Sequence, residues 1–397
     1  MADAASYHES TPLFLDHQAT TPTDVAVVEA MLPFFYGSHG NPSSSTTASG
    51  REAAIAVRKA REQVAALINA EPEEIVFTSG ATESNNLALL GVASFVGRRT
   101  ERTALLGTAI EHKAVLEPLK YLSGRGYATR LLPVTPTARI DTSFFASAID
   151  DSAILVSMQL ASNEVGTIQP IAEVAQHAHE HGALIHSDAA QAIGKIPVDV
   201  QGLGVDLMSI SAHKFYGPKG VGALYVRNGP RSFPIDPIVH GGGQEAGIRS
   251  GTLNVPGIVG FGKACELASE RLERDQRAMQ IARDTFEERL LSGRQKVTIN
   301  GDVYWRLPNS SSITFHGLDA EAIAVNAPQL QVSAGPACNS GALEPSHVLR
   351  AMGMSRPDAY STLRIGFGRS NTVDEASWAA ENLLNAAALV ARGSSRG

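Results

Sequence analysis

Short apolar runs alternate with longer amphipathic stretches along most of the chain. Apolar runs bounded by turn residues predict buried strands, and apolar residues three or four positions apart predict helices that cover a sheet. We expect a first ordered segment at 13–16 and strands at 74–78, 104–107, 128–132, 154–157, 183–186, 207–210 and 221–226. We expect helices at 25–35, 51–69, from the turn 79–83 through 96, 113–123, 142–149 and 171–181. This alternation predicts an α/β fold with a mostly parallel sheet and right-handed crossovers.

The alternation stops at a long charged helix, 260–291, which we expect to link two domains. A chain of 397 residues exceeds the usual size of a single core. We assign 21–258 to a large α/β domain, 259–397 to a smaller α+β domain, and 1–20 to an N-terminal segment that packs with the small domain. The spacing in helix 51–69 predicts the core positions Ile55, Val57, Val64, Leu67 and Ile68.

Composition and charge exclude several classes of protein. Hydrophobic residues make up 43% of the chain and charged residues 18%, an ordinary globular balance. A net charge of −7 offers no basic surface for nucleic acid. The sequence has no apolar stretch of membrane-spanning length and no apolar signal core at its start, so we expect a cytoplasmic protein. The two cysteines, Cys265 and Cys338, argue against a disulfide framework and for a reducing compartment.

A lysine and an aspartate follow two of the predicted strands. Lys214 stands at a Gly/Pro-rich turn after strand 207–210. A lysine held there can reach into a cleft and form a Schiff base with a carbonyl cofactor, although an isolated lysine would be a solvated surface residue. Asp188 follows strand 183–186, at the end where doubly wound sheets place ligand contacts. Pyridoxal phosphate (PLP) needs both groups: a lysine for attachment and an acid that keeps its pyridine nitrogen protonated.

The segments Asp188-Ala189-Ala190-Gln191 and Ser211-Ala212-His213-Lys214 resemble the class V aminotransferase group of fold-type I PLP enzymes, and within it the cysteine desulfurases. The resemblance covers about residues 13–369 and rests on several long motifs. It implies a fold-type I PLP transferase, with a large domain built on a mostly parallel sheet and a smaller α+β C-terminal domain. It also implies a homodimer in which Lys214 carries the cofactor.

The resemblance also assigns residues to the cofactor. Thr78 to Asn86 leads from a strand into a helix, whose N-terminal N–H groups favour an anion. The residues implied to contact the phosphate of PLP are Ala81, Thr82, Ser211 and His213. Thr252, in a Gly-rich segment, is implied to reach the phosphate in the partner subunit. Gln191 is implied to donate to the phenolic oxygen, while Asp188 holds the pyridine nitrogen.

Three further residues are assigned around the substrate by the same resemblance. His112 is implied to stack on the pyridine face and assist proton transfers; the alternative is a histidine that only caps a helix. Asn163 is implied to lie near the phenolic oxygen and the substrate carboxylate. Arg364 is implied to bind that carboxylate through a bidentate fork, which lysine cannot reproduce. No residues are assigned to a metal.

Cys338 lies among small and polar residues, so we expect its thiol to be exposed and reactive. In the desulfurases the cysteine at this position takes the substrate sulfur and holds it as a persulfide. Cys265 is expected to pack from a helix against the core and to have no role in catalysis. The chain departs from the family's usual residues at Thr47, Ser162, Ala246, Pro336 and Asn339. These departures spare the cofactor residues and alter the periphery.

Three hypotheses follow. The first is a cysteine desulfurase that converts L-cysteine to alanine and an enzyme persulfide, which a sulfur-acceptor protein would receive. The second is a PLP-dependent C–S lyase or decarboxylating deaminase acting on an S-substituted cysteine in specialised metabolism. Thr47 and Ala246 stand where the family usually has a histidine and a basic residue, and these replacements could leave room at the mouth of the active site. The third is a non-enzymatic scaffold, against which Lys214, Asp188 and Arg364 count.

Overall fold

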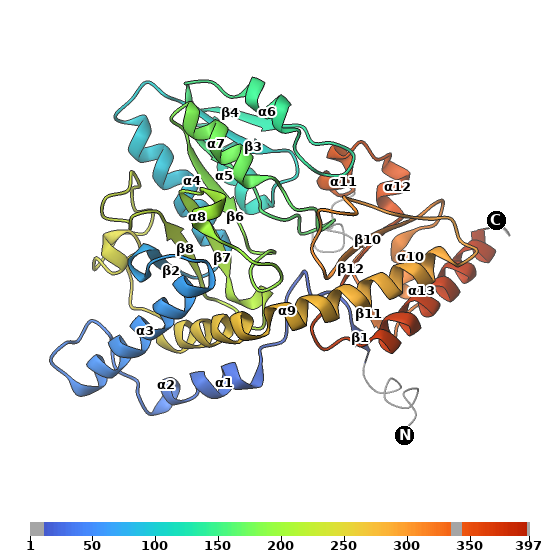
Figure 1. The fold of residues 1–397 in the computed structure, drawn as a ribbon, viewed down its shortest axis with the longest axis horizontal. Helices are drawn as coiled ribbons and strands as arrows, with labels where there is room; N and C mark the ends of the chain where they lie inside the picture. The colour runs from blue at the N-terminus through green and yellow to red at the C-terminus, as the bar shows by residue number, and fades with distance from the viewer. Residues whose placement is uncertain (1–11, 335–343, 395–397) are drawn as a thin grey trace.

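A computed structural model of the chain describes residues 12–334 and 344–394 (Figure 1). Its strands are β1 (Leu13–Phe14), β2 (Ile75–Thr78), β3 (Ala104–Thr108), β4 (Ala128–Leu132), β5 (Ala153–Ser157), β6 (Leu184–Asp188), β7 (Leu207–Ser211), β8 (Gly222–Val226), β9 (Val297–Ile299), β10 (Ser310–Phe315), β11 (Leu330–Gln331) and β12 (Thr362–Gly366). Its α-helices are α1 (Val25–Met31), α2 (Pro33–Tyr36), α3 (Ala48–Leu67), α4 (Ala81–Gly97), α5 (Lys113–Ser123), α6 (Thr142–Ala148), α7 (Ile171–Glu180), α8 (Val200–Leu203), α9 (Val255–Leu291), α10 (Ala320–Val325), α11 (His347–Ala351), α12 (Arg356–Tyr360) and α13 (Val373–Ser394). Short 3₁₀ helices lie at Pro72–Glu74, Ala212–Lys214 and Glu245–Gly247.

The large sheet has seven strands in the order β2-β8-β7-β6-β5-β3-β4. β7, β6, β5, β3 and β4 run parallel, and β8 is antiparallel to both of its neighbours. β8 follows β7 after a turn too short for a crossover, which explains its reversed direction. The predicted mostly parallel α/β sheet is confirmed.

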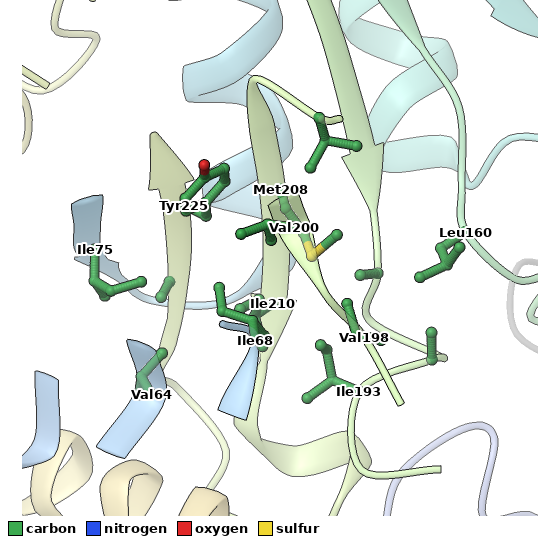
Figure 2. Packing of buried hydrophobic residues seen from close by; sticks show 14 of the residues in the cluster. Val64, Ile68, Ile75, Leu160, Ile193, Val198, Val200, Met208, Ile210 and Tyr225 are labelled. Atoms are coloured by element: carbon green, nitrogen blue, oxygen red, sulfur yellow. The ribbon is translucent and has the colours of Figure 1, made fainter. Parts of the chain in front are cut away.

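Helices cover both faces of this sheet, so successive residues of a strand point into opposite cores. On β3, Leu106 packs in a cluster with residues of α3, α7 and α9, whereas Leu105 packs in a cluster with residues of α4 and α5. Figure 2 shows part of the first cluster, including Val64, Ile75 and Tyr225. A sheet buried on both faces has near-continuous apolar strands, which is the pattern that the sequence shows.

A second core lies around the antiparallel sheet β12-β10-β9. Phe315 of this sheet belongs to a cluster with Phe286 of α9 and Leu383 of α13. The first half of α9 contributes Phe261 to the large core, so this helix joins the two cores, as Figure 1 shows. β1 pairs in parallel with β11, which brings the N-terminal segment against the second core. The domain boundaries proposed at residues 20 and 258 stay predictions.

Several element predictions need correction. The helix predicted at 25–35 is two helices, because Pro33 begins α2 and cannot continue the hydrogen bonding of α1. The long helix starts earlier than predicted, at Val255, where Asn254 caps it. Ile55 is not a core residue, because its side chain is 57% exposed. It lies about 200° around α3 from the buried Ala53 and Val57, on the outer face.

Candidate active site

A cavity of about 710 Å³ opens at the carboxyl ends of β2, β6 and β7. These strands end at the same edge of the large sheet, so the residues that follow them converge there. The predicted site residues that line this cavity are Ala81, Thr82, His112, Asn163, Asp188, Gln191, Ser211, His213, Lys214 and Arg364. These residues are far apart in the sequence, from Ala81 to Arg364, and the fold brings them together.

Lys214 ends the 3₁₀ turn between β7 and β8, and its side chain is half-buried. Its Nζ donates hydrogen bonds to the main-chain oxygens of Gln18 (2.7 Å) and Ala19 (2.8 Å). Burial, helped by the positive charge of Arg364, lowers the pKa of Lys214 to about 8. An amine with this pKa is partly neutral near pH 7.5 and can act as a nucleophile or a base.

Asp188 is buried at the end of β6, and both of its carboxylate oxygens have donors. Asn85 of α4 donates its Nδ2 to Oδ2 at 2.7 Å, and the backbone N–H of Ala190 donates to Oδ1 at 3.0 Å. A buried carboxylate that is held in this way can pair with a cationic group inside the cavity. Asn85 therefore fixes the acid on which the predicted cofactor site depends.

The end of the cavity beside α4 is built for an anion. α4 begins at Ala81 directly after Gly80, whose φ of +148° is a conformation that glycine adopts readily. The first N–H groups of a helix have no partner inside the helix, and they favour a negative charge. Ser211 and His213 line the same cavity. Burial lowers the pKa of His213 to about 4, and its Nδ1 lies 3.0 Å from the Thr20 hydroxyl.

His112 caps a helix and also lies at the cavity, so its predicted role at the cofactor stays a prediction. It is the N-cap of α5, where its Nδ1 accepts a hydrogen bond from the N–H of Ala114 at 3.0 Å. The same residue also lines the cavity. Burial lowers the pKa of His112, and the cap leaves the ring proton on Nε2.

Arg364, on β12, brings the second core into the cavity. Its guanidinium donates to the Asp16 carboxylate at 2.8 Å and to the main-chain oxygen of Asn163 at 3.2 Å. Its buried Nε has no hydrogen-bond partner among the described residues. A planar cation with spare donors suits a carboxylate ligand.

Other predicted residues lie elsewhere. Thr252 does not line this cavity; it borders a separate groove with Phe34 and Asn254. Thr47 caps α3 on the surface, and the hydroxyl of the buried Ser162 accepts from the N–H of Glu164. Cys338, with its neighbours Pro336 and Asn339, falls outside the described residues. Cys265 is buried in α9, as predicted.

The sequence reasoning missed three buried residues beside the cavity. Asn85 lies one helical turn after Ala81, a spacing that would have placed both on the same face of α4. Glu111 is fully buried, and Lys195 is only 3% exposed. The sequence does not indicate that either residue is buried, because a charged residue in a loop is normally solvated.

Within residues 12–334 and 344–394, no group of three His, Cys, Asp or Glu side chains could hold a metal ion. In the same residues, every helix is too short or too polar to cross a membrane.

Comparison with known proteins gives the family. The aminotransferase class-V family matches residues 13–377. Cysteine desulfurase IscS of Neisseria meningitidis serogroup C is 47% identical over 371 residues, or 94% of this chain and 91% of that protein. The mitochondrial cysteine desulfurase of Arthroderma benhamiae is 46% identical over 367 residues, or 92% of this chain and 72% of that protein.

Solved structures agree. A NifS-like protein has a TM-score of 0.88 and 37% identity, covering 96% of this chain and all of its own (100%). A structure of SspA in complex with cysteine has a TM-score of 0.80 and 35% identity, covering 90% of this chain and 99% of its own. The two-core fold with its cavity at the strand ends is that of the fold-type I enzymes. Within them, the chain belongs to the aminotransferase class-V family and to its cysteine desulfurases. The predicted fold class and family resemblance are therefore confirmed.

Proposed function

We propose that this protein is a PLP-dependent cysteine desulfurase, which converts L-cysteine to alanine and leaves the sulfur on the enzyme as a persulfide. The proposal is supported by one observation: a lysine whose pKa is lowered, a buried aspartate and an arginine with spare donors line one cavity. Relatives named cysteine desulfurase share nearly half of their residues with this chain over most of its length.

The residues present fit PLP. The N-terminus of α4, with Ala81 and Thr82, and the side chains of Ser211 and His213 would hold the phosphate. Lys214 would hold the cofactor covalently through Nζ. The cofactor's ring nitrogen would pair with Asp188, and its ring face would lie against His112. Gln191 would donate a hydrogen bond to its phenolic oxygen. When bound, PLP supplies an electron sink for the bonds at the substrate's Cα.

The protein's own residues would do the rest. Arg364, with Asn163 beside it, would bind the α-carboxylate of the amino acid through donors that the Asp16 contact leaves free. Asp16 also fixes the direction of the guanidinium. The Lys214 amine, once released, would take the proton from Cα, since its pKa of about 8 leaves it partly neutral at working pH.

Cys338 would be the sulfur acceptor. Its thiolate would attack the substrate sulfur, so that an S–S bond forms while the C–S bond breaks. The electron pair of the broken bond stays on carbon, where a proton completes alanine. The overall exchange is L-cysteine plus enzyme thiol giving alanine plus enzyme persulfide, with no external oxidant.

The lyase alternative relied on extra room where Thr47 and Ala246 replace the family's usual residues. Within one subunit, neither residue lines the cavity that contains Lys214, so this cavity gives the alternative no direct support. The scaffold alternative does not explain why Lys214 and Asp188 are held in one cavity by specific contacts. Desulfurase chemistry on free L-cysteine therefore remains the function that the site supports best.

We also propose a homodimer in the cytoplasm that passes its sulfur to an acceptor protein. Apolar side chains of α1 and α2 support the dimer, since Val25, Phe35 and Tyr36 are 72%, 62% and 75% exposed. Large apolar side chains exposed on two neighbouring helices favour an interaction surface. Thr252 borders a groove next to α2, where it would reach the phosphate in the partner subunit.

The test locates the sulfur. The PLP-loaded protein is incubated with L-cysteine without reductant, digested and analysed by mass spectrometry. We expect the peptide that contains Cys338 to gain one sulfur atom. Cys338→Ala should lose both the gain and alanine formation, whereas Cys265→Ala, a buried residue of α9, should keep both. Full alanine formation by Cys338→Ala would contradict the assigned acceptor.

A further inference from the structure

A second lysine lies buried behind the cavity, in the turn that follows β6. Lys195 is only 3% exposed and does not line the cavity. Its Nζ donates a hydrogen bond at 3.0 Å to Oε1 of Gln191, which does line the cavity. A buried lysine is costly, so a specific contact is needed to hold it there. Among the described residues, Gln191 is the one hydrogen-bond partner of the Lys195 side chain.

The side-chain amide of Gln191 is fixed at both of its ends. Oε1 receives the Lys195 bond, and Nε2 donates to the main-chain oxygen of Gln18 at 2.9 Å. A carbonyl can only accept, so the NH₂ group must face Gln18. The same Gln18 oxygen also accepts from Lys214 at 2.7 Å. The amide therefore lies beside the lysine that would carry the cofactor.

An amide NH₂ group has two N–H donors. One goes to Gln18, and among the described residues the other has no partner. If the amide rotated by half a turn, its Oε1 would take the place of the NH₂ group and would face the main-chain oxygen of Gln18. Lys195 opposes that rotation together with Gln18, because its hydrogen bond holds Oε1 on the side away from Gln18.

We propose that Lys195 is a positioning residue that orients the Gln191 amide, so that its free N–H is presented to the phenolic oxygen of PLP. The inference rests on the proposed binding of PLP and adds to it a residue that does not touch the cofactor. Lys195 acts through Gln191 and sets how strongly the phenolic oxygen is stabilised as an anion.

The contact persists whether or not Lys195 is charged. Burial lowers the pKa of Lys195 to about 7, with further lowering by the positive charges of Lys214 and Arg364. Both the ammonium and the neutral amine carry N–H groups, so either can donate to Oε1. The positioning role thus depends on geometry rather than on a fixed charge.

The experiment uses Lys195→Met, which keeps an unbranched side chain and removes the donor. PLP-loaded protein is titrated while the visible absorption band of the bound PLP is recorded. Loss of a donor to the phenolic oxygen disfavours its anionic form, so the pH midpoint of the band should rise. A single hydrogen bond predicts a rise of about 0.4 to 1 pH unit. Lys263→Met, a lysine of α9 that pairs with Glu266, is the control and should leave the midpoint unchanged.

A double-mutant cycle separates positioning from a general structural role. In a Gln191→Ala background, Lys195→Met should shift the midpoint by much less than in the wild type, because the amide it orients is gone. Equal shifts in both backgrounds, or no shift in either, would overturn the proposal.

A readout without cofactor keeps the two proposals distinguishable. In PLP-free protein labelled with ¹⁵N-glutamine, the side-chain NH₂ signals of Gln191 are assigned by their loss in Gln191→Ala. Lys195→Met should move those signals, whereas Lys263→Met should not. Unmoved signals would refute the positioning role. If Lys195→Met produces the predicted shifts but the wild-type protein does not turn over L-cysteine, only the proposed function is refuted.

Discussion

Glu111 provides a prediction whose size follows from the structure. This residue is fully buried behind the cavity, where it accepts hydrogen bonds from the N–H of Gln159 at 2.9 Å and from the Thr108 hydroxyl. Burial, assisted by the negative charge of Asp188, raises the pKa of Glu111 from 4.5 to about 8. The folded protein therefore keeps a proton on Glu111 that the unfolded chain releases near pH 4.5.

The direction in which folding stability changes with pH depends on which state, folded or unfolded, binds the extra proton. Between about pH 4.5 and pH 8 the folded state holds one more proton, so its stability falls as pH rises. Each pH unit costs about 1.4 kcal/mol, which limits the loss to about 5 kcal/mol over this window. Glu111→Gln stays neutral and can keep both contacts, since its NH₂ group can donate to the Thr108 oxygen.

Urea unfolding of the PLP-free proteins at pH 5, 6.5 and 8 measures the effect. The free energy of unfolding of Glu111→Gln should match the wild type within about 1 kcal/mol at pH 5 and exceed it by about 3–5 kcal/mol at pH 8. Glu117→Gln, at an exposed position on α5, is the matched control and should follow the wild type at each pH. A stability difference between Glu111→Gln and the wild type that stays constant, or shrinks as pH rises, would contradict the raised pKa of Glu111.

Two further predictions concern the catalytic groups. Arg364→Lys should raise KM for L-cysteine by about 10- to 100-fold, because the loss of a charge-assisted fork costs about 1.5–3 kcal/mol; an unchanged KM in steady-state kinetics would argue against carboxylate binding. Lys214 must be neutral to capture PLP, so the rate of PLP uptake by the apo-protein, followed by absorbance, should rise with pH around a midpoint near 8. A midpoint near the ordinary lysine value of 10.5 would contradict the lowered pKa.

Parallel strands explain why much of the site could be predicted from the sequence. Asp188 and Ser211 end strands that the apolar runs identify, and such ends meet at one edge of the sheet. Local pattern also gave α4, with its anion-binding N-terminus, directly after β2. The role of Arg364 came from the family resemblance alone, because no local pattern links β12 to β6.

Contacts between distant segments could not be predicted in this way. The Lys214 ammonium is held by Gln18, which is 196 positions away, and no spacing rule relates the two. The burial of Glu111 and Lys195 depends on packing from several elements, so their charges gave no signal. Ile55 shows the opposite error, since an apolar residue in an amphipathic helix can still face outwards.

The product formed from L-cysteine tests the proposed desulfurase function most directly. PLP-loaded protein is incubated with L-cysteine and a reductant, and the products are identified by mass spectrometry, with Lys214→Ala as the inactive control. We expect alanine and sulfide in equal amounts, formed by the wild type and not by the control. Pyruvate with sulfide would mean β-elimination, and an absence of turnover would mean that L-cysteine is not the substrate. Either result would contradict the proposed desulfurase function.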